Sequence, residues 1–171
     1  DLSVNANPYT GGSWSYVYDP NASPAMVIIS EFLADNSGKT YRDEDGYKSD
    51  WIELYNAGEI AVNLDGWYLT DDTNNLRKWR FPGVTINTNS YLVVFASGKN
   101  KTNITGRLHT NFKLKASGGY LALVDLYDRI VSDFGTSYPE QYTDVSYGRD
   151  RIISSIVGYF NTPTPGSPNS I

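Results

Sequence analysis

Short apolar runs that alternate with polar residues constrain this chain more than any other feature of its sequence. Trp79 and Phe81, for example, alternate with Lys78 and Arg80. A period of two places successive side chains on opposite faces of a β-strand. No run shows the i, i+3, i+4 spacing over the length that an independent helix requires. The pattern therefore predicts strands.

Turn-forming residues separate these runs. Asp-Gly pairs occur at 45–46 and 65–66, and Ser-Gly-Gly occurs at 117–119. Such residues adopt the backbone conformations that tight turns between strands need. Eight to ten short strands at this spacing, without crossover helices, predict an all-β, antiparallel β-sandwich.

The ends of the chain differ in composition from its middle. Residues 1–25 are rich in turn formers and aromatics, and we expect an N-terminal arm or edge strand that packs on the domain. Residues 26–160 form the predicted domain, and residues 161–171, with three prolines, read as a tail or linker. Residues 91–96, "YLVVFA", are apolar on both faces. Such a strand needs a cover over its outer face, and we expect the arm to supply it.

Charge and composition exclude several classes of function. The 171 residues carry a net charge of −5, which argues against a nucleic-acid partner, because a phosphate backbone needs a basic face. Lys99, Lys101 and Arg107 form the nearest basic stretch, and we expect a solvated loop there. The chain has no cysteine, and no apolar run is long enough for membrane insertion. Because it begins at Asp1 without Met, we expect a fragment or processed form of a longer protein.

Several short motifs in order carry a family resemblance. They are "IISEFLADNSG", "DEDGYKSDWIELYNAG", "VNLDGWYLTDD", "KWRFPGVTI", "YLVVFASGKN", "LHTNFKLKASGGYLALVD", "VSYGRD" and "YFNTPTPGSPN". Together, over roughly residues 26–169, they resemble a bacterial lamin-tail domain. The resemblance implies an immunoglobulin-like β-sandwich, in agreement with the strand pattern.

The resemblance also implies a class of function. Bacterial lamin-tail domains resemble accessory modules of large secreted or surface proteins, often beside hydrolases or adhesive modules. We therefore expect a non-catalytic binding or spacer module whose partners are other protein domains or surface polymers. No heptad segment is present, so the filament role of nuclear lamins is not expected. A carbohydrate-binding accessory module is the alternative.

Residues 35–50, here named the acidic loop, raise the question of a metal site. Hard cations such as calcium prefer six to eight oxygen ligands, and clustered aspartates with a glycine turn suit that chemistry. The spacing does not match an EF-hand, since the glycine falls at position four when counted from Asp43. An irregular calcium site would use Asp43, Asp45 and Asp50, helped by Asp71 or Asp72. The alternative is a solvated turn without any cofactor.

Three residues are candidates for catalysis. Glu31 and Glu53 each lie mid-strand, and two carboxyl groups could act as acid and base in glycoside hydrolysis if a cleft separated them. The alternative places them near strand edges, where they accept hydrogen bonds. His109 is the only histidine, and a Ser-His-Asp triad would need it as the base. Alternation places His109 on a polar strand face, so we expect it to be exposed.

Aromatic residues offer a platform on which sugar rings stack. Trp67 and Trp79 fall in apolar strand patterns and are predicted to lie in the core. Trp51 and Tyr47 are the candidate carbohydrate-binding residues, because Trp51 lies opposite the apolar face of its strand. Trp14 and Tyr138 are also free to be exposed.

Overall fold

The computed structural model describes residues 26–39 and 41–169, which form strands and no helix. The strands are β1 (Val27–Leu33), β2 (Asp50–Asn56), β3 (Val62–Asn63), β4 (Tyr68–Thr70), β5 (Trp79–Arg80), β6 (Thr85–Ile86), β7 (Tyr91–Ala96), β8 (Leu108–His109), β9 (Ala122–Val124), β10 (Ile130–Asp133), β11 (Ser146–Arg149) and β12 (Val157–Phe160). No helix long and apolar enough to cross a membrane occurs in these ranges.

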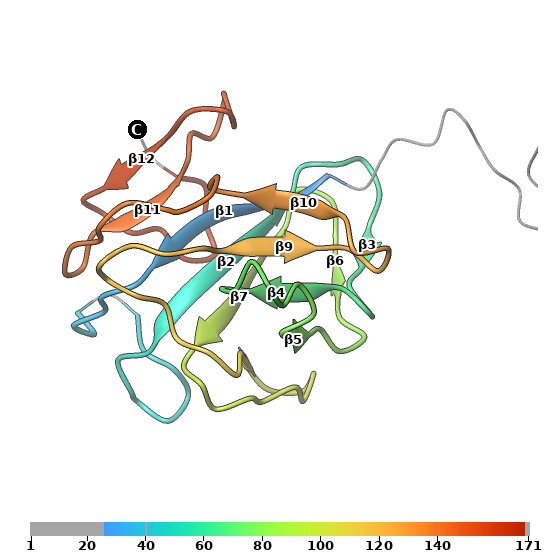
Figure 1. The fold of residues 1–171 in the computed structure, drawn as a ribbon, viewed down its shortest axis with the longest axis horizontal. Coiled ribbons are helices and arrows are strands. Elements are labelled where there is room, and N and C mark those ends of the chain that lie inside the picture. Colours follow the sequence, from blue (N-terminus) through green and yellow to red (C-terminus); the bar gives the residue numbers. More distant parts are fainter. Residues whose placement is uncertain (1–25, 40, 170–171) are drawn as a thin grey trace, which may run out of the picture.

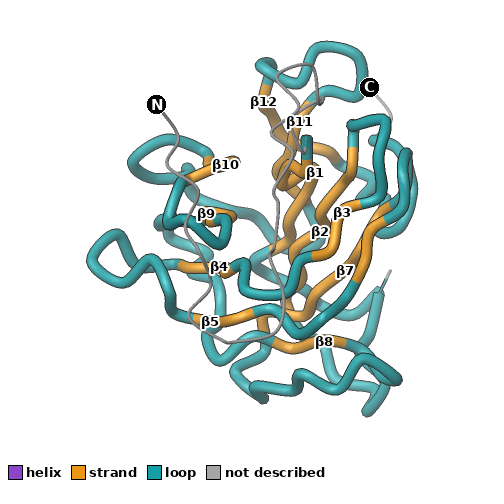
Figure 2. Tube along the Cα trace, turned by 90° about the vertical axis from the view of Figure 1, so that its right-hand side faces the viewer, coloured by secondary structure: helices purple, strands orange, loops and turns teal. Residues whose placement is uncertain are grey.

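Two sheets pack face to face, which Figure 2 shows from the side. One has six strands in the order β12-β11-β1-β2-β7-β8, and the other has four in the order β10-β9-β4-β5. In Figure 1, β9 and β4 lie in front of β1, β2 and β7. The architecture confirms the predicted immunoglobulin-like β-sandwich. Pairing is antiparallel except between β7 and β8, which run parallel.

The inner face of the six-stranded sheet forms the main core. Phe32, Ile52 and Val94 pair in one row across β1, β2 and β7, and all three are buried. Leu69 and Leu123, from the four-stranded sheet, belong to the same cluster. Alternation along β2 thus points Ile52 and Leu54 inward, as its sequence predicts.

The outer face of the same three strands is also buried at one end. Leu33, Trp51 and Phe95 form a second row there. Tyr41 of the acidic loop stacks on Phe95 with ring centroids 5.4 Å apart, and the His109 ring lies on Phe95 at 5.1 Å. The prediction that β7 needs a cover on its outer face is therefore confirmed. The described cover comes from the acidic loop and β8, while the predicted arm, residues 1–25, lies outside the described residues.

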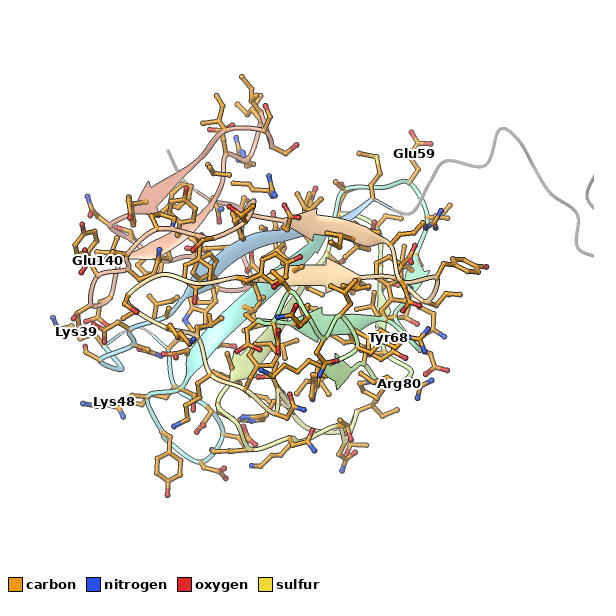
Figure 3. The ribbon with its side chains drawn as sticks, viewed as in Figure 1. Lys39, Lys48, Glu59, Tyr68, Arg80 and Glu140 are labelled. Atoms are coloured by element: carbon orange, nitrogen blue, oxygen red, sulfur yellow. The ribbon has the colours of Figure 1, made fainter. Side chains whose placement is uncertain are left out.

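This second layer corrects the aromatic assignments. Trp51 has no exposed surface and Tyr138 only 2%, so the expectation that they could be exposed is wrong. Trp67 and Trp79 lie in the core, as predicted. Trp14 lies outside the described residues. In contrast to these buried aromatic rings, several charged side chains point into solvent at the rim of the molecule, as Figure 3 shows.

Strand number and length differ from the sequence prediction. The described residues contain twelve strands rather than eight to ten, and β3, β5, β6 and β8 have only two residues each. Segments so short show no measurable period. β12 is not among the predicted runs, because three of the five residues before it, 152–156, are also apolar and hide its alternation.

Residues 161–169, here named the C-terminal segment, pack back onto the outer face rather than extending away. Thr164 donates its N–H and hydroxyl to Glu31, and the Gly166 N–H donates to Glu53. Asn169 Nδ2 donates to backbone carbonyls in β1 and β11, at 3.2 and 2.8 Å. The part of the predicted tail or linker that is described is thus a component of the domain.

Trp51→Ala tests the buried outer layer. We expect it to lower the free energy of unfolding by about 3–5 kcal/mol, because it removes a buried indole. Trp51→Phe should lower the free energy of unfolding by less, since the indole N–H has no hydrogen-bond partner among the described residues. Tyr47→Ala is the control, because Tyr47 is 63% exposed, and it should shift stability by less than about 0.5 kcal/mol in urea denaturation. Equal losses from the two alanine variants would contradict this arrangement.

Candidate functional site

The acidic loop is organised around the buried carboxylate of Asp43. Its Oδ1 accepts the backbone N–H groups of Asp45 and Tyr47, at 3.1 and 2.8 Å, and its Oδ2 accepts the Ser49 hydroxyl at 2.7 Å. Aspartate suits such turns because its short side chain reaches N–H groups two to four residues ahead. Gly46, with φ of +80°, completes the predicted turn.

Asn36 anchors the start of the loop. It is buried, and its Nδ2 donates to the backbone carbonyls of Tyr41 and Ser49, both at 2.8 Å. Its Oδ1 accepts the Gly38 N–H at 2.7 Å. A buried amide that replaces backbone partners fixes the loop shape. Sequence reasoning assigned Asn36 no role, since asparagine is common in any polar turn.

Two lysines neutralise the acidic loop. Lys99 Nζ lies 2.6 Å from Asp43 and 2.8 Å from Asp45, and Lys101 Nζ lies 2.7 Å from both Glu44 and Asp45. Burial tends to raise the pKa of Asp43, but hydrogen bonds from Lys99 and Ser49 outweigh it and lower that pKa to about 2. The expectation of a merely solvated basic stretch is therefore wrong for these lysines, because they pair with carboxylates.

The predicted calcium ligands do not converge. Asp43 and Asp45 face the lysines, whereas Asp50 opens β2, and burial raises the pKa of its carboxyl to about 7. No group of three or more carboxylate or imidazole side chains spaced for one metal ion occurs among the described residues. Asp71 instead pairs with Lys78 at 2.6 Å. The calcium site stays a prediction.

His109 is buried, so the expectation of an exposed histidine is wrong. Its Nδ1 lies 2.8 Å from Ser97 Oγ, and its Nε2 lies 2.9 Å from Glu44 Oε2. A carboxylate only accepts hydrogen bonds, so Nε2 carries the proton in that contact. The backbone N–H of Lys99 donates to Ser97 Oγ at 3.2 Å. Sequence spacing gave no signal for this chain of contacts, because its members come from three separate segments.

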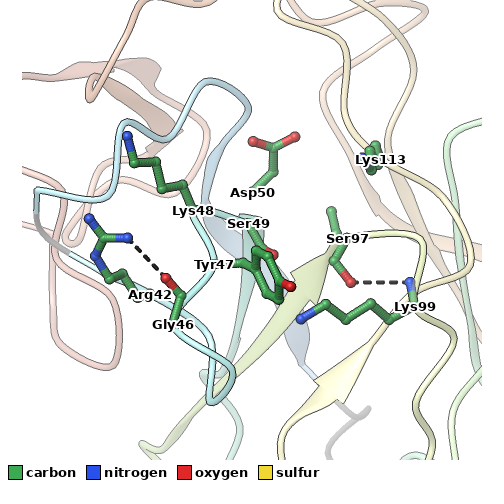
Figure 4. Close-up of a pocket in the computed structure, with 10 residues that line it drawn as sticks. Arg42, Gly46, Tyr47, Lys48, Ser49, Asp50, Ser97, Lys99 and Lys113 are labelled. Atoms are coloured by element: carbon green, nitrogen blue, oxygen red, sulfur yellow. Dashed lines mark hydrogen bonds between the residues drawn. The ribbon is translucent and has the colours of Figure 1, made fainter.

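A pocket of about 550 Å³ lies beside this network, between the acidic loop and the end of β7. Figure 4 shows the residues around it. The lining residues are Arg42, Gly46, Tyr47, Lys48, Ser49, Asp50, Ala96, Ser97, Lys99 and Lys113. Of the two predicted carbohydrate-binding residues, Tyr47 lines the pocket with an exposed ring, whereas Trp51 is buried and cannot serve as a platform.

Glu31 and Glu53 are brought together, because they pair in register across β1 and β2. Both are fully buried beneath the C-terminal segment, and not near strand edges. Ser30 donates to Glu53 at 2.6 Å, and Ser146 donates to Glu31. Burial raises the pKa of both carboxyls, that of Glu53 to about 8, with the nearby Glu31 charge adding to the effect.

Comparison with known families agrees with this architecture. The family model of the Lamin Tail Domain matches residues 20–137, about two thirds of the 171 residues. The chain belongs to the lamin tail domain family. The match includes the acidic loop and the strands from β1 to β10. A search of curated proteins found no match.

This lamin tail domain extends beyond the matched region. β11 lies past residue 137, yet it pairs with β1 in the six-stranded sheet. A Cβ at Gly148 of β11 would clash with the backbone oxygen of Ser30, so this close approach requires glycine. The C-terminal segment that covers Glu31 and Glu53 also lies past the match.

Glu53→Gln tests the buried carboxyl pair. Because the pKa of Glu53 rises from about 4.5 to about 8 on folding, the folded state holds a proton that the unfolded state releases. Its contribution to stability is therefore full below pH 4.5 and is lost as pH rises toward 8. The melting temperature of the wild type should fall over this pH range. That of Glu53→Gln should fall less, so that the variant is more stable than the wild type at pH 8. Identical pH dependence in both proteins would contradict the assignment.

Proposed function

We propose that this lamin tail domain is a non-catalytic binding or spacer module of a larger secreted or cell-surface bacterial protein. Its partners would be other protein domains or surface polymers. The observation that carries the proposal is the sealing of Glu31 and Glu53, the candidate acid and base. Both have no exposed surface, and the hydroxyl and N–H donors around them satisfy their oxygens. The secreted or surface location draws its support from the family resemblance alone.

The Ser97–His109–Glu44 network fits a structural role as well. It joins the acidic loop to β8 and the end of β7, and the His109 ring is stacked on Phe95 with no exposed surface. A general base must reach the proton that it removes and return it to a leaving group. Burial of His109 does not favour that exchange with a substrate.

Carbohydrate binding is the second candidate function. Its support is Tyr47, whose exposed ring lies at a pocket with polar and charged walls. Aromatic rings beside hydrogen-bonding groups suit ligands with one apolar face and many hydroxyls. Trp51 no longer contributes to this candidate.

Calcium binding to the acidic loop also stays a proposal. The ion would have to displace the ammonium groups of Lys99 and Lys101 from Asp43 and Asp45. If it binds there, millimolar calcium should raise the melting temperature of the wild type and leave Asp45→Asn unchanged. An unchanged melting temperature in the wild type would contradict calcium binding, and the lysines would then be the only counterions of these carboxylates among the described residues.

A serine-directed fluorophosphonate probe tests the non-catalytic proposal. Because His109 is buried and stacked, we expect no covalent adduct on Ser97 by intact-mass spectrometry. We also expect no release of reducing ends from a panel of polysaccharides. An adduct on Ser97 that is lost in His109→Asn, or hydrolysis that is lost in Glu53→Gln, would overturn the proposal. A probe-reactive serine hydrolase run in parallel confirms that the reagent is active.

A further inference from the structure

Three of the four cations that line the pocket beside the acidic loop form no ion pair among the described residues. Of the fourteen lysines and arginines, seven form ion pairs with carboxylates of the described residues. Arg42, Lys48 and Lys113 form none there, and all three line the pocket. The chain as a whole has nineteen acidic residues, so carboxylates are not scarce. Asp50 is the only carboxylate among the residues that line the pocket, so positive charge predominates around it and favours a bound anion.

Arg42 and Lys48 are held close together by the loop. An ideal Cβ at Gly38 would lie 2.7 Å from Lys48 Cγ and 2.9 Å from Arg42 Cζ, so both side chains pack over this glycine. The Arg42 guanidinium also donates to the Gly46 carbonyl at 2.9 Å, which Figure 4 shows as a dashed line. These contacts order the Arg42 guanidinium beside Gly46 before any ligand arrives, which lowers the entropy cost of binding.

The remaining walls are suited to a sugar ring. Tyr47 is 63% exposed, and Lys99 Nζ lies 4.5 Å from its ring centroid. Asp50 lies on the same pocket, where its carboxyl group can accept a hydrogen bond from a hydroxyl. The volume of about 550 Å³ falls within the range of ordinary ligand pockets. A uronic acid combines the three groups that such a pocket would contact. It has a ring that can stack on Tyr47, hydroxyls that can donate hydrogen bonds, and a carboxylate that can bind the cations.

We propose that this pocket binds an acidic polysaccharide through its uronate residues. The carboxylate of the sugar would contact Arg42 and Lys48, with Lys113 at the opposite wall, and the sugar ring would pack against Tyr47. Two other anions fit the pocket less well. Inorganic phosphate would make no contact with the Tyr47 ring, and an acidic peptide has no hydroxylated ring to stack on it. The inference rests on the proposed role as a binding module and names the class of polymer that it binds.

Isothermal titration of the full chain with polygalacturonate and with alginate tests the proposal. Fully methyl-esterified polygalacturonate is the matched probe, because it keeps the sugar rings and loses the charge. We expect binding to at least one of the two uronate polymers, at least about tenfold tighter than to the esterified polymer, and weakened by added salt. Arg42→Gln, Lys48→Gln and Tyr47→Ala should each weaken binding about tenfold, which corresponds to about 1.4 kcal/mol. Thermal melting shows whether each variant folds.

Arg151→Gln is the matched control, because Arg151 is exposed, forms no ion pair among the described residues and does not line this pocket. It should bind as the wild type does. The assignment is overturned if neither uronate polymer binds, or if the esterified polymer binds as tightly as the uronate polymers. It is also overturned if Arg151→Gln loses as much affinity as Lys48→Gln. Equal binding of poly-glutamate would overturn the choice of a sugar ligand. None of these results would affect the non-catalytic proposal, which fails only on covalent labelling or hydrolysis.

Discussion

The burial of β1, β2 and β7 on both faces is the constraint on which the rest of this structure depends. Phe32, Ile52 and Val94 face the opposing sheet, while Leu33, Trp51 and Phe95 face away from it. A β-sandwich by itself covers only the first row. The second row needs a further layer, because a large apolar face open to water is unfavourable. The acidic loop and β8 supply part of that layer, and the pocket lies beside this cover.

Covering the outer face also buries groups that normally contact water. Glu31 and Glu53 lie in the next row along the same strands, where the C-terminal segment seals them. Burial disfavours the charged form of a carboxyl group and raises the pKa of Glu53 to about 8, and the Glu31 charge beside it adds to the effect. On the other side of the loop, Lys99 compensates the buried Asp43, whose pKa falls instead. Burial thus raises the pKa of the carboxyls beneath the C-terminal segment, whereas hydrogen bonds within the acidic loop lower that of Asp43.

Prediction from the sequence succeeded where a local pattern decides the outcome. The alternation in β2 assigned Ile52 and Leu54 to the core, and the Asp-Gly pair at 45–46 marked a turn. The candidate site was harder to predict. His109 follows a polar pattern, yet it is buried because the acidic loop folds over it. Trp51 lies on the predicted outer face, but a loop that begins sixteen residues earlier removes it from solvent.

The sequence by itself determined the strands, the turns between them and the family of this lamin tail domain, because period-two patterning and glycine turns act over a few residues. Only the tertiary structure decided which side chains reach water and which charges meet. Asp43 and Lys99 lie 56 residues apart in the chain, and Glu31 and Thr164 lie 133 apart. No spacing rule connects such pairs. They meet because the acidic loop and the C-terminal segment both pack on the outer face of the six-stranded sheet, which must be buried.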